Sequence, residues 1–120
     1  METVNHPSHY QSVSQIGRPI LEALGIPEAT LEMECIEAIE SLEATRRWNF
    51  NILNAVKYLW RCGMKGDAVK DLRKAQWYFA RHLESNFVCH SLSPTVGTRR
   101  AINRAIPLIE STIAKLEGKP

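Results

Sequence analysis

"NFNILNAVKYLWRCGMKGDAVKDLRKAQWYFARHLE", residues 49–84, is the stretch that decides the fold. Its first half predicts an amphipathic helix that opens near Asn49 or Asn51 and stops at Gly63, a residue suited to the left-handed position after a helix. The link "MKGD" then predicts a turn into a second helix, capped by Asp67. Apolar spacing predicts buried faces made of Leu53, Val56, Leu59 and Trp60 in the first helix, and of Leu72, Ala75, Phe79 and Leu83 in the second.

Two further helices are expected around this hairpin. Thr30 is suited to cap a helix whose apolar face contains Leu31, Cys35, Ala38, Ile39 and Leu42. A helix over residues 99–117 should carry a narrow seam of Ile102, Ile106, Ile109, Ile113 and Leu116, with Pro107 kinking or breaking it. Residues 12–29 contain Gly and Pro and predict an irregular connection with at most a short helix at residues 20–24. The prediction is an all-α fold, a small bundle of three to four helices with an irregular N-terminal segment.

The composition is that of one domain with reduced thiols. A chain of 120 residues can bury a core without disulfides. Its three cysteines form no C-x-x-C pair, which favours a reducing compartment. No run approaches the roughly 18 apolar residues of a membrane helix, and no signal-peptide core opens the chain. We therefore expect a cytoplasmic protein with no membrane partner.

The net charge of +2 hides an uneven distribution. Seven glutamates and no basic residue lie within residues 21–45, whereas residues 57–81 contain seven basic residues against two aspartates. The two segments either pair across the fold or leave the basic one open to an anion. On the first basic helix, one polar stripe contains Asn54, Lys57, Tyr58 and Arg61. On the second, Trp77 and Tyr78 lie outside the apolar face among Lys70, Lys74 and Arg81, and exposed aromatic rings favour a partner.

Four blocks of the sequence carry a family resemblance: "NHPSHY", "ECIEAIE", "NFNILNAVKYLWRCGMKGD" and "DLRKAQWYFARHLE". In this order they resemble the SaV-like family of small bacteriophage domains, some described as nucleotide kinases acting on deoxynucleoside monophosphates. The resemblance covers about half of the chain. It implies a nucleotide-handling helical domain at residues 1–90, with residues 12–33 inserted after the histidine motif, and a C-terminal helical extension at residues 91–120 for packing or assembly. It also implies a phage protein in the host cytoplasm.

The resemblance further implies a site around a phosphorylated ligand. Its expected catalytic residues are His6, His9, Lys57, Arg61 and Asp67, and its expected ligand-binding residues are Tyr10, Asn54, Lys57, Tyr58, Arg61, Lys65, Lys74 and Trp77. Lysine supplies a point charge, arginine a two-pronged donor for phosphate oxygens, and histidine a proton carrier near neutral pH. Trp77 or Tyr78 would stack on a base, and Asp67 would help to hold Mg²⁺.

Three functions stay open at this point. The first is a nucleotide kinase, a transferase without a P-loop, since no G-x-x-x-x-G-K-[ST] occurs. The second is a non-catalytic binder that sequesters a nucleotide or a nucleotide-derived signal. The third is a pyrophosphohydrolase that holds Mg²⁺ through Glu34, Glu37, Glu40, Asp67 and Asp71. Zinc at the H-x-x-H of residues 6–9 would need further ligands, such as Cys35 or Cys89, and a nucleic acid partner is not expected.

A homo-oligomer is also predicted. The isoleucine seam at residues 102–116 is more apolar than a short terminal helix needs for docking. Trp48, Trp60 and Trp77 add more aromatic surface than one small core readily hides. Association of two copies would cover both, unless the seam packs within its own chain.

Overall fold

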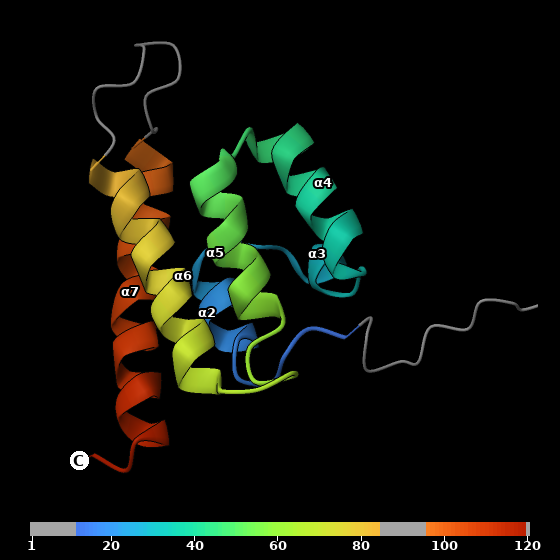
Figure 1. The fold of residues 1–120 in the computed structure, drawn as a ribbon. Coiled ribbons are helices and arrows are strands. Elements are labelled where there is room, and N and C mark those ends of the chain that lie inside the picture. The colour runs from blue at the N-terminus through green and yellow to red at the C-terminus, as the bar shows by residue number, and fades with distance from the viewer. Residues whose placement is uncertain (1–11, 85–95, 120) are drawn as a thin grey trace, which may run out of the picture.

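The fold is taken from a computed structural model, which describes residues 12–84 and 96–119. Within these ranges every regular element is a helix (Figure 1), which confirms the all-α prediction. In chain order the helices are α2 (Arg18–Ala23), α3 (Glu28–Leu31), α4 (Cys35–Arg46), α5 (Phe50–Trp60), α6 (Ala68–Glu84) and α7 (Val96–Leu116). In the described part of the chain, no helix combines the length and apolar character needed to span a membrane.

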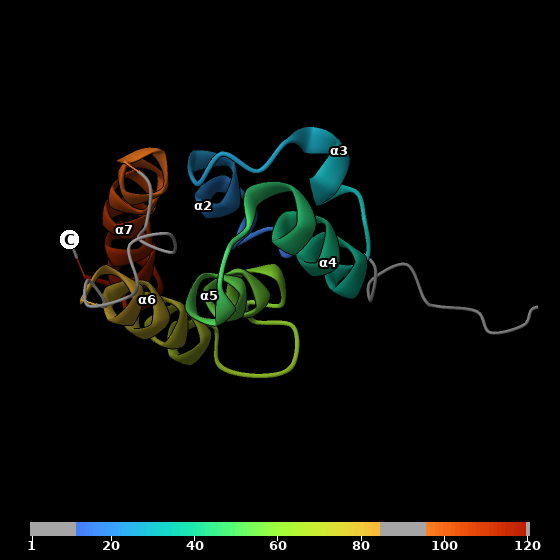
Figure 2. The same cartoon turned by 90° about the horizontal axis from the view of Figure 1, so that it is seen from above.

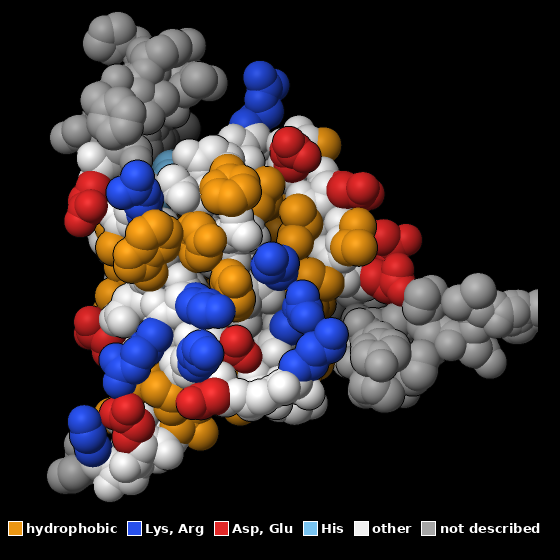
Figure 3. All heavy atoms as spheres, viewed as in Figure 1, with side chains coloured by type: hydrophobic (Ala, Val, Ile, Leu, Met, Phe, Trp, Pro, Cys, Tyr) orange, Lys and Arg blue, Asp and Glu red, His pale blue; other side chains and the backbone are white. Residues whose placement is uncertain are grey.

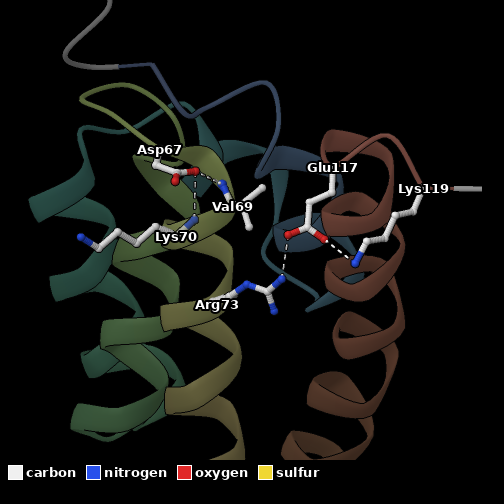
Figure 4. A network of polar contacts seen from close by, with 6 residues as sticks. All are labelled: Asp67, Val69, Lys70, Arg73, Glu117 and Lys119. Atoms are coloured by element: carbon white, nitrogen blue, oxygen red, sulfur yellow. Dashed lines mark hydrogen bonds and ion pairs between the residues drawn. The ribbon is translucent and has the colours of Figure 1, made fainter.

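Helices α5 and α6 form the predicted hairpin. The Asn49 side chain accepts a hydrogen bond from the Ile52 backbone N–H (3.1 Å), which caps the start of α5. Gly63 has φ = 77°, the left-handed conformation expected after a helix. Asp67 Oδ1 accepts hydrogen bonds from the backbone N–H groups of Val69 (2.9 Å) and Lys70 (3.3 Å), so the predicted cap of α6 is confirmed (Figure 4). The predicted core residues of both helices are buried, apart from Leu53 and Leu83, which are partly buried.

Helix α2 packs against α5 and α7. Helices α7, α6, α5 and α4 follow one another in an arc around it (Figure 2). The short helix predicted at residues 20–24 is therefore present, but its surroundings are more than an irregular connection. The side chains of Ile20, Leu21 and Leu24 are each at most 1% exposed, so this segment supplies part of the main core.

Gly17 allows α2 to approach α5 closely. A Cβ atom at residue 17 would lie 1.8 Å from the Leu59 carbonyl oxygen and 2.7 Å from its carbonyl carbon. Both atoms belong to the backbone of α5, so no rotation of a side chain could make room. Only glycine is compatible with this contact between the two helices.

The segment before α2 is anchored by the buried hydroxyl of Ser14. Its Oγ donates to the Cys62 carbonyl oxygen (2.8 Å) and accepts from the backbone N–H groups of Ile16 (3.1 Å) and Gly17 (3.2 Å). The Ser14 backbone N–H also donates to the Trp60 carbonyl oxygen (2.8 Å). One side chain thus joins the start of α2 to the end of α5.

The helix predicted to begin at Thr30 is divided into α3 and α4. Thr30 lies inside α3 and is buried, so its predicted role as a cap is wrong. The chain leaves the helical conformation at Glu34, with ψ = 154°, before α4 begins at Cys35. The apolar spacing continues across this break, because a periodic pattern reports which face is buried and not whether the backbone is continuous.

Helix α7 begins at Val96 and continues through Pro107, so of the kink or break predicted there, the break does not occur. Pro107 leaves the carbonyl of Asn103 without its helical partner, and both residues are exposed, so water can take the place of the missing N–H. On the opposite face Ile102, Ile109 and Ile113 are buried in the core of their own chain.

The C-terminal end of α7 is also held by charges. Arg73 Nη2 of α6 contacts Glu117 Oε2 at 2.9 Å, and Lys119 Nζ lies 3.3 Å from Glu117 Oε1 (Figure 4). Since α7 contacts both α2 and α6, the isoleucine seam gives no support to association. Trp48 and Trp60 are buried as well. The homo-oligomer stays a prediction, now supported by Trp77, which is 57% exposed.

One buried histidine was not anticipated. His82 of α6 is 4% exposed, and its Nδ1 lies 3.0 Å from Asn49 Nδ2. Asn49 Oδ1 accepts the hydrogen bond that caps α5, so the Asn49 Nδ2 amide faces His82 as a donor. His82 Nδ1 must then accept this hydrogen bond, and the neutral ring carries its proton on Nε2. Burial, followed by the nearby positive charge of Arg99, lowers the pKa of His82.

Candidate functional site

A cavity of about 210 Å³ lies at the turn between α5 and α6. It is lined by Lys57 and Tyr58 of α5, Arg61 and Lys65 of the turn, and Asp71 of α6. The first four belong to the predicted ligand-binding set, so the structure brings these residues together. Lys and Arg side chains gather over this part of the α5 and α6 surface (Figure 3).

The cations of this cavity are not neutralised by ion pairs with any residue that the structure describes. In residues 12–84 and 96–119, Lys57, Arg61 and Lys65 form no ion pair with a carboxylate. Arg18 pairs with two glutamates of the acidic segment, at Glu22 (3.2 Å) and Glu28 (2.7 Å). Within these residues, pairing of the acidic and basic segments therefore does not account for the charges at the cavity, where the Asp71 carboxylate accepts a hydrogen bond from the Gly63 backbone N–H.

The turn that carries Arg61 and Lys65 is fixed by polar contacts. Asp71 Oδ2 accepts a hydrogen bond from the Gly63 backbone N–H (3.0 Å), and Cys62 Sγ contacts the Ala68 carbonyl oxygen at 3.5 Å. Burial and the nearby Asp71 carboxylate raise the pKa of Cys62 to about 12, so its thiol stays neutral. The sequence suggested Asp71 only as a magnesium ligand, and no signal in it revealed this contact with the turn.

An aromatic cluster extends from the cavity along α5 and α6. The rings of Tyr58 and Tyr78 stack at 5.9 Å, and Tyr78 meets the edges of Trp77 (5.1 Å) and Phe50 (6.2 Å). Lys57 and Lys74 each place Nζ 5.2 Å from the centre of the Tyr58 ring. Lys74 is thereby connected to the cavity through Tyr58, while Trp77 and Phe50 are both exposed members of the cluster.

Other predicted site residues lie elsewhere or outside the described part. The Asn54 amide donates to the Phe50 carbonyl oxygen (3.0 Å), so it is bonded to its own helix and does not line the cavity. Asp67 is engaged as the cap of α6 and does not line it either. His6, His9 and Tyr10 fall outside the described residues, as does Cys89.

No metal-binding cluster is formed within the described ranges. Among these residues, no three of His, Cys, Asp or Glu converge on one point. The carboxylate set proposed for a pyrophosphohydrolase, at residues 34, 37, 40, 67 and 71, is therefore not assembled. Cys35 is half-buried at the start of α4, and burial raises its pKa although the positive charges of Arg61 and Lys57 act in the opposite direction.

Comparisons with known proteins add one family. No curated protein matched the chain, and no solved structure did. The family model DUF3310, described as a protein of unknown function, matches residues 29–80. This range includes every residue that lines the cavity at the α5–α6 turn, so the cavity lies wholly within the part of the chain that is similar to this family.

Proposed function

We propose that this protein binds the phosphate group of a nucleotide, or of another phosphorylated small molecule, in the cavity at the α5–α6 turn. The observation that carries the proposal is the convergence of Lys57, Arg61 and Lys65 on one cavity, where no carboxylate of the described residues forms an ion pair with any of them. A guanidinium and two ammonium groups supply charge-assisted hydrogen bonds to several phosphate oxygens.

The aromatic cluster supports a nucleotide over a plain phosphate. A phosphate held by Lys57 and Arg61 would leave the rest of the ligand to lie along Tyr58 and Lys74, toward the exposed ring of Trp77. Stacking of a base on an aromatic ring contributes about 1–3 kcal/mol in single-strand-binding proteins, and we propose that Trp77 acts in the same way here.

Binding is better supported than turnover. The resemblance to SaV-like domains favours a nucleotide kinase, but the expected proton carriers His6 and His9 lie outside the described residues. Mg²⁺, the proposed cofactor, would have to arrive with the phosphates of the ligand, because the described residues provide no three-ligand cluster. A phosphate-binding protein is thus our first proposal, and a kinase that uses the same cavity is the second.

The test is a panel of nucleoside mono- and triphosphates, with and without Mg²⁺. Calorimetry measures binding, and phosphorus NMR identifies any product. Lys57→Gln and Arg61→Gln should each weaken binding by about 1.5–3 kcal/mol, or roughly 10- to 150-fold in Kd, because each removes one charge-assisted contact. Lys115→Gln, an equal charge change on the exposed surface of α7, is the control and should change Kd less than about two-fold.

The outcomes separate the three functions. Transfer of phosphate between nucleotides supports a kinase, release of pyrophosphate a hydrolase, and recovery of the unchanged ligand a binder. Normal binding by both Lys57→Gln and Arg61→Gln would refute the proposed site, and the failure of every nucleotide in the panel to bind would exclude a nucleotide as its ligand.

A further inference from the structure

A second cavity lies at the opposite end of α5, where α2 and α4 end and α7 begins. Its volume is about 350 Å³, within the range typical of small-molecule sites. It shares no lining residue with the cavity at the α5–α6 turn. Arg46 of α4 and Arg104 of α7 line it together with Gly25, Trp48 and Gly97.

Two guanidinium groups converge in this cavity. Arg46 Nη2 donates to the Gly25 carbonyl oxygen (2.9 Å), and Arg104 Nε donates to the Ala23 carbonyl oxygen (3.0 Å). A Cβ atom built on Gly25 would lie 3.9 Å from a terminal nitrogen of each arginine, so both groups reach the same place from different helices. The Arg46 guanidinium also lies 5.6 Å from the centre of the Trp48 ring, which holds it in place.

The positive charge at this cavity is not compensated by any carboxylate in the described part of the chain. Within the described ranges, neither Arg46 nor Arg104 forms an ion pair with a carboxylate. Each arginine uses one donor on the carbonyls at the end of α2, and a guanidinium has five. The hydrogen bonds to the end of α2 therefore use only some of the N–H donors of these two side chains, and the other donors can bind a ligand.

The start of α7 adds to the positive potential. Gly97 and Thr98 line the cavity, and the first turn of this 21-residue helix contains no acidic residue. Instead Arg99 lies there, the reverse of the arrangement that a helix dipole favours. A helix N-terminus and two convergent guanidinium groups together favour a ligand with several anionic oxygens.

We propose that this second cavity binds the phosphoryl group of a small phosphate ester, between Arg46 and Arg104 and in front of the first turn of α7. The site does not depend on the function proposed for the α5–α6 turn. Planar guanidinium groups pair with two phosphate oxygens at a time, which selects a phosphoryl group over chloride.

Inorganic pyrophosphate is the probe, titrated into the ¹⁵N-labelled full-length chain at constant ionic strength. The amide signals of Gly25 and Gly97 report on this cavity, and that of Gly63 reports on the α5–α6 turn. The amide signals of Gly25 and Gly97 should shift and then reach a plateau as the pyrophosphate concentration is raised. Arg46→Gln and Arg104→Gln should each weaken that response at least about ten-fold, the loss expected for a charge-assisted contact, while the response of Gly63 is unchanged.

Matched variants keep the test sharp. Arg100→Gln removes an equal charge from the exposed surface of the same helix without touching the cavity, and should change the response of Gly25 less than about two-fold. Arg104→Lys keeps the positive charge but removes the planar guanidinium that donates two parallel hydrogen bonds, so it should weaken binding while retaining the fold. Loss of binding in Arg100→Gln equal to that in Arg104→Gln would overturn the proposal, as would linear, unsaturated shifts at Gly25 and Gly97. If pyrophosphate shifts the amide signals of Gly25 and Gly97 but not that of Gly63, the result contradicts only the site proposed at the α5–α6 turn.

Discussion

Replacing Ser14 by alanine should lower the free energy of unfolding by about 3 kcal/mol. The hydroxyl is buried and takes part in three hydrogen bonds, one to the Cys62 carbonyl oxygen and two from the backbone N–H groups of Ile16 and Gly17. Each such bond contributes about 1 kcal/mol, and alanine leaves all three backbone groups with one partner fewer beside a side chain that is only 3% exposed. For a chain of this size the loss corresponds to a fall in Tm of roughly 10 °C.

Urea denaturation followed by circular dichroism measures this change. The control is Ser111→Ala, because Ser111 Oγ also donates to a carbonyl oxygen, that of Leu108 (3.2 Å), but on the exposed surface of α7. Its effect should stay within about 0.5 kcal/mol. If Ser14→Ala is no more destabilising than Ser111→Ala, the anchoring of α2 to α5 through this hydroxyl is refuted.

Four other outcomes can be tested, of which the first three follow from contacts described above and the fourth from the site that the family resemblance implies. Gly17→Ala should destabilise the fold by about 3 kcal/mol, since its methyl group would overlap the backbone of α5, and an unchanged melting curve would contradict that close approach. The pKa of His82 lies below its ordinary value of 6.5, so as the pH falls the unfolded chain binds this proton before the folded chain does. The free energy of unfolding should therefore decrease as the pH falls below about 6.5, by at most about 1.4 kcal/mol per pH unit. His82→Gln should remove this pH dependence. If urea denaturation shows that the free energy of unfolding falls equally steeply in the wild type and in His82→Gln between pH 7.5 and 5.5, the role of His82 is contradicted. Iodoacetamide at pH 8 should modify half-buried Cys35 faster than buried Cys62 in the folded protein and both equally in denaturant, as peptide mass spectrometry would show. Deletion of residues 1–11 should abolish nucleotide binding without unfolding the domain, and unimpaired binding would exclude His6 and His9 from the site.

Local signals explain what the sequence could predict. The caps at Asn49 and Asp67 and the left-handed Gly63 act within a few residues of their partners, so the α5–α6 hairpin was read correctly. The cationic cavity is formed by the same stretch, because Lys57 and Tyr58 lie about one helical turn before Arg61, and Lys65 follows four residues later in the turn.

Long-range contacts explain what it could not. Helix α2 has only six residues, and its burial depends on α5 and α7, which are distant in the chain. The Ser14 hydroxyl bonds a carbonyl 48 residues away, and Arg104 reaches a carbonyl 81 residues away. No periodic pattern in the sequence reveals such pairs, so the cavity between Arg46 and Arg104 could not be predicted from the sequence.

The packing of α7 against α2 sets the order in which this chain can fold while it is being synthesised. Ile20 and Leu21 near the start of the described chain share one core with Ile102 and Ile109. A growing chain can form the α5–α6 hairpin early, but α2 keeps apolar surface exposed until α7 has left the ribosome. A ribosome that stalls between the codons for α6 and α7 would therefore hold a nascent chain with an open core, a natural substrate for chaperones.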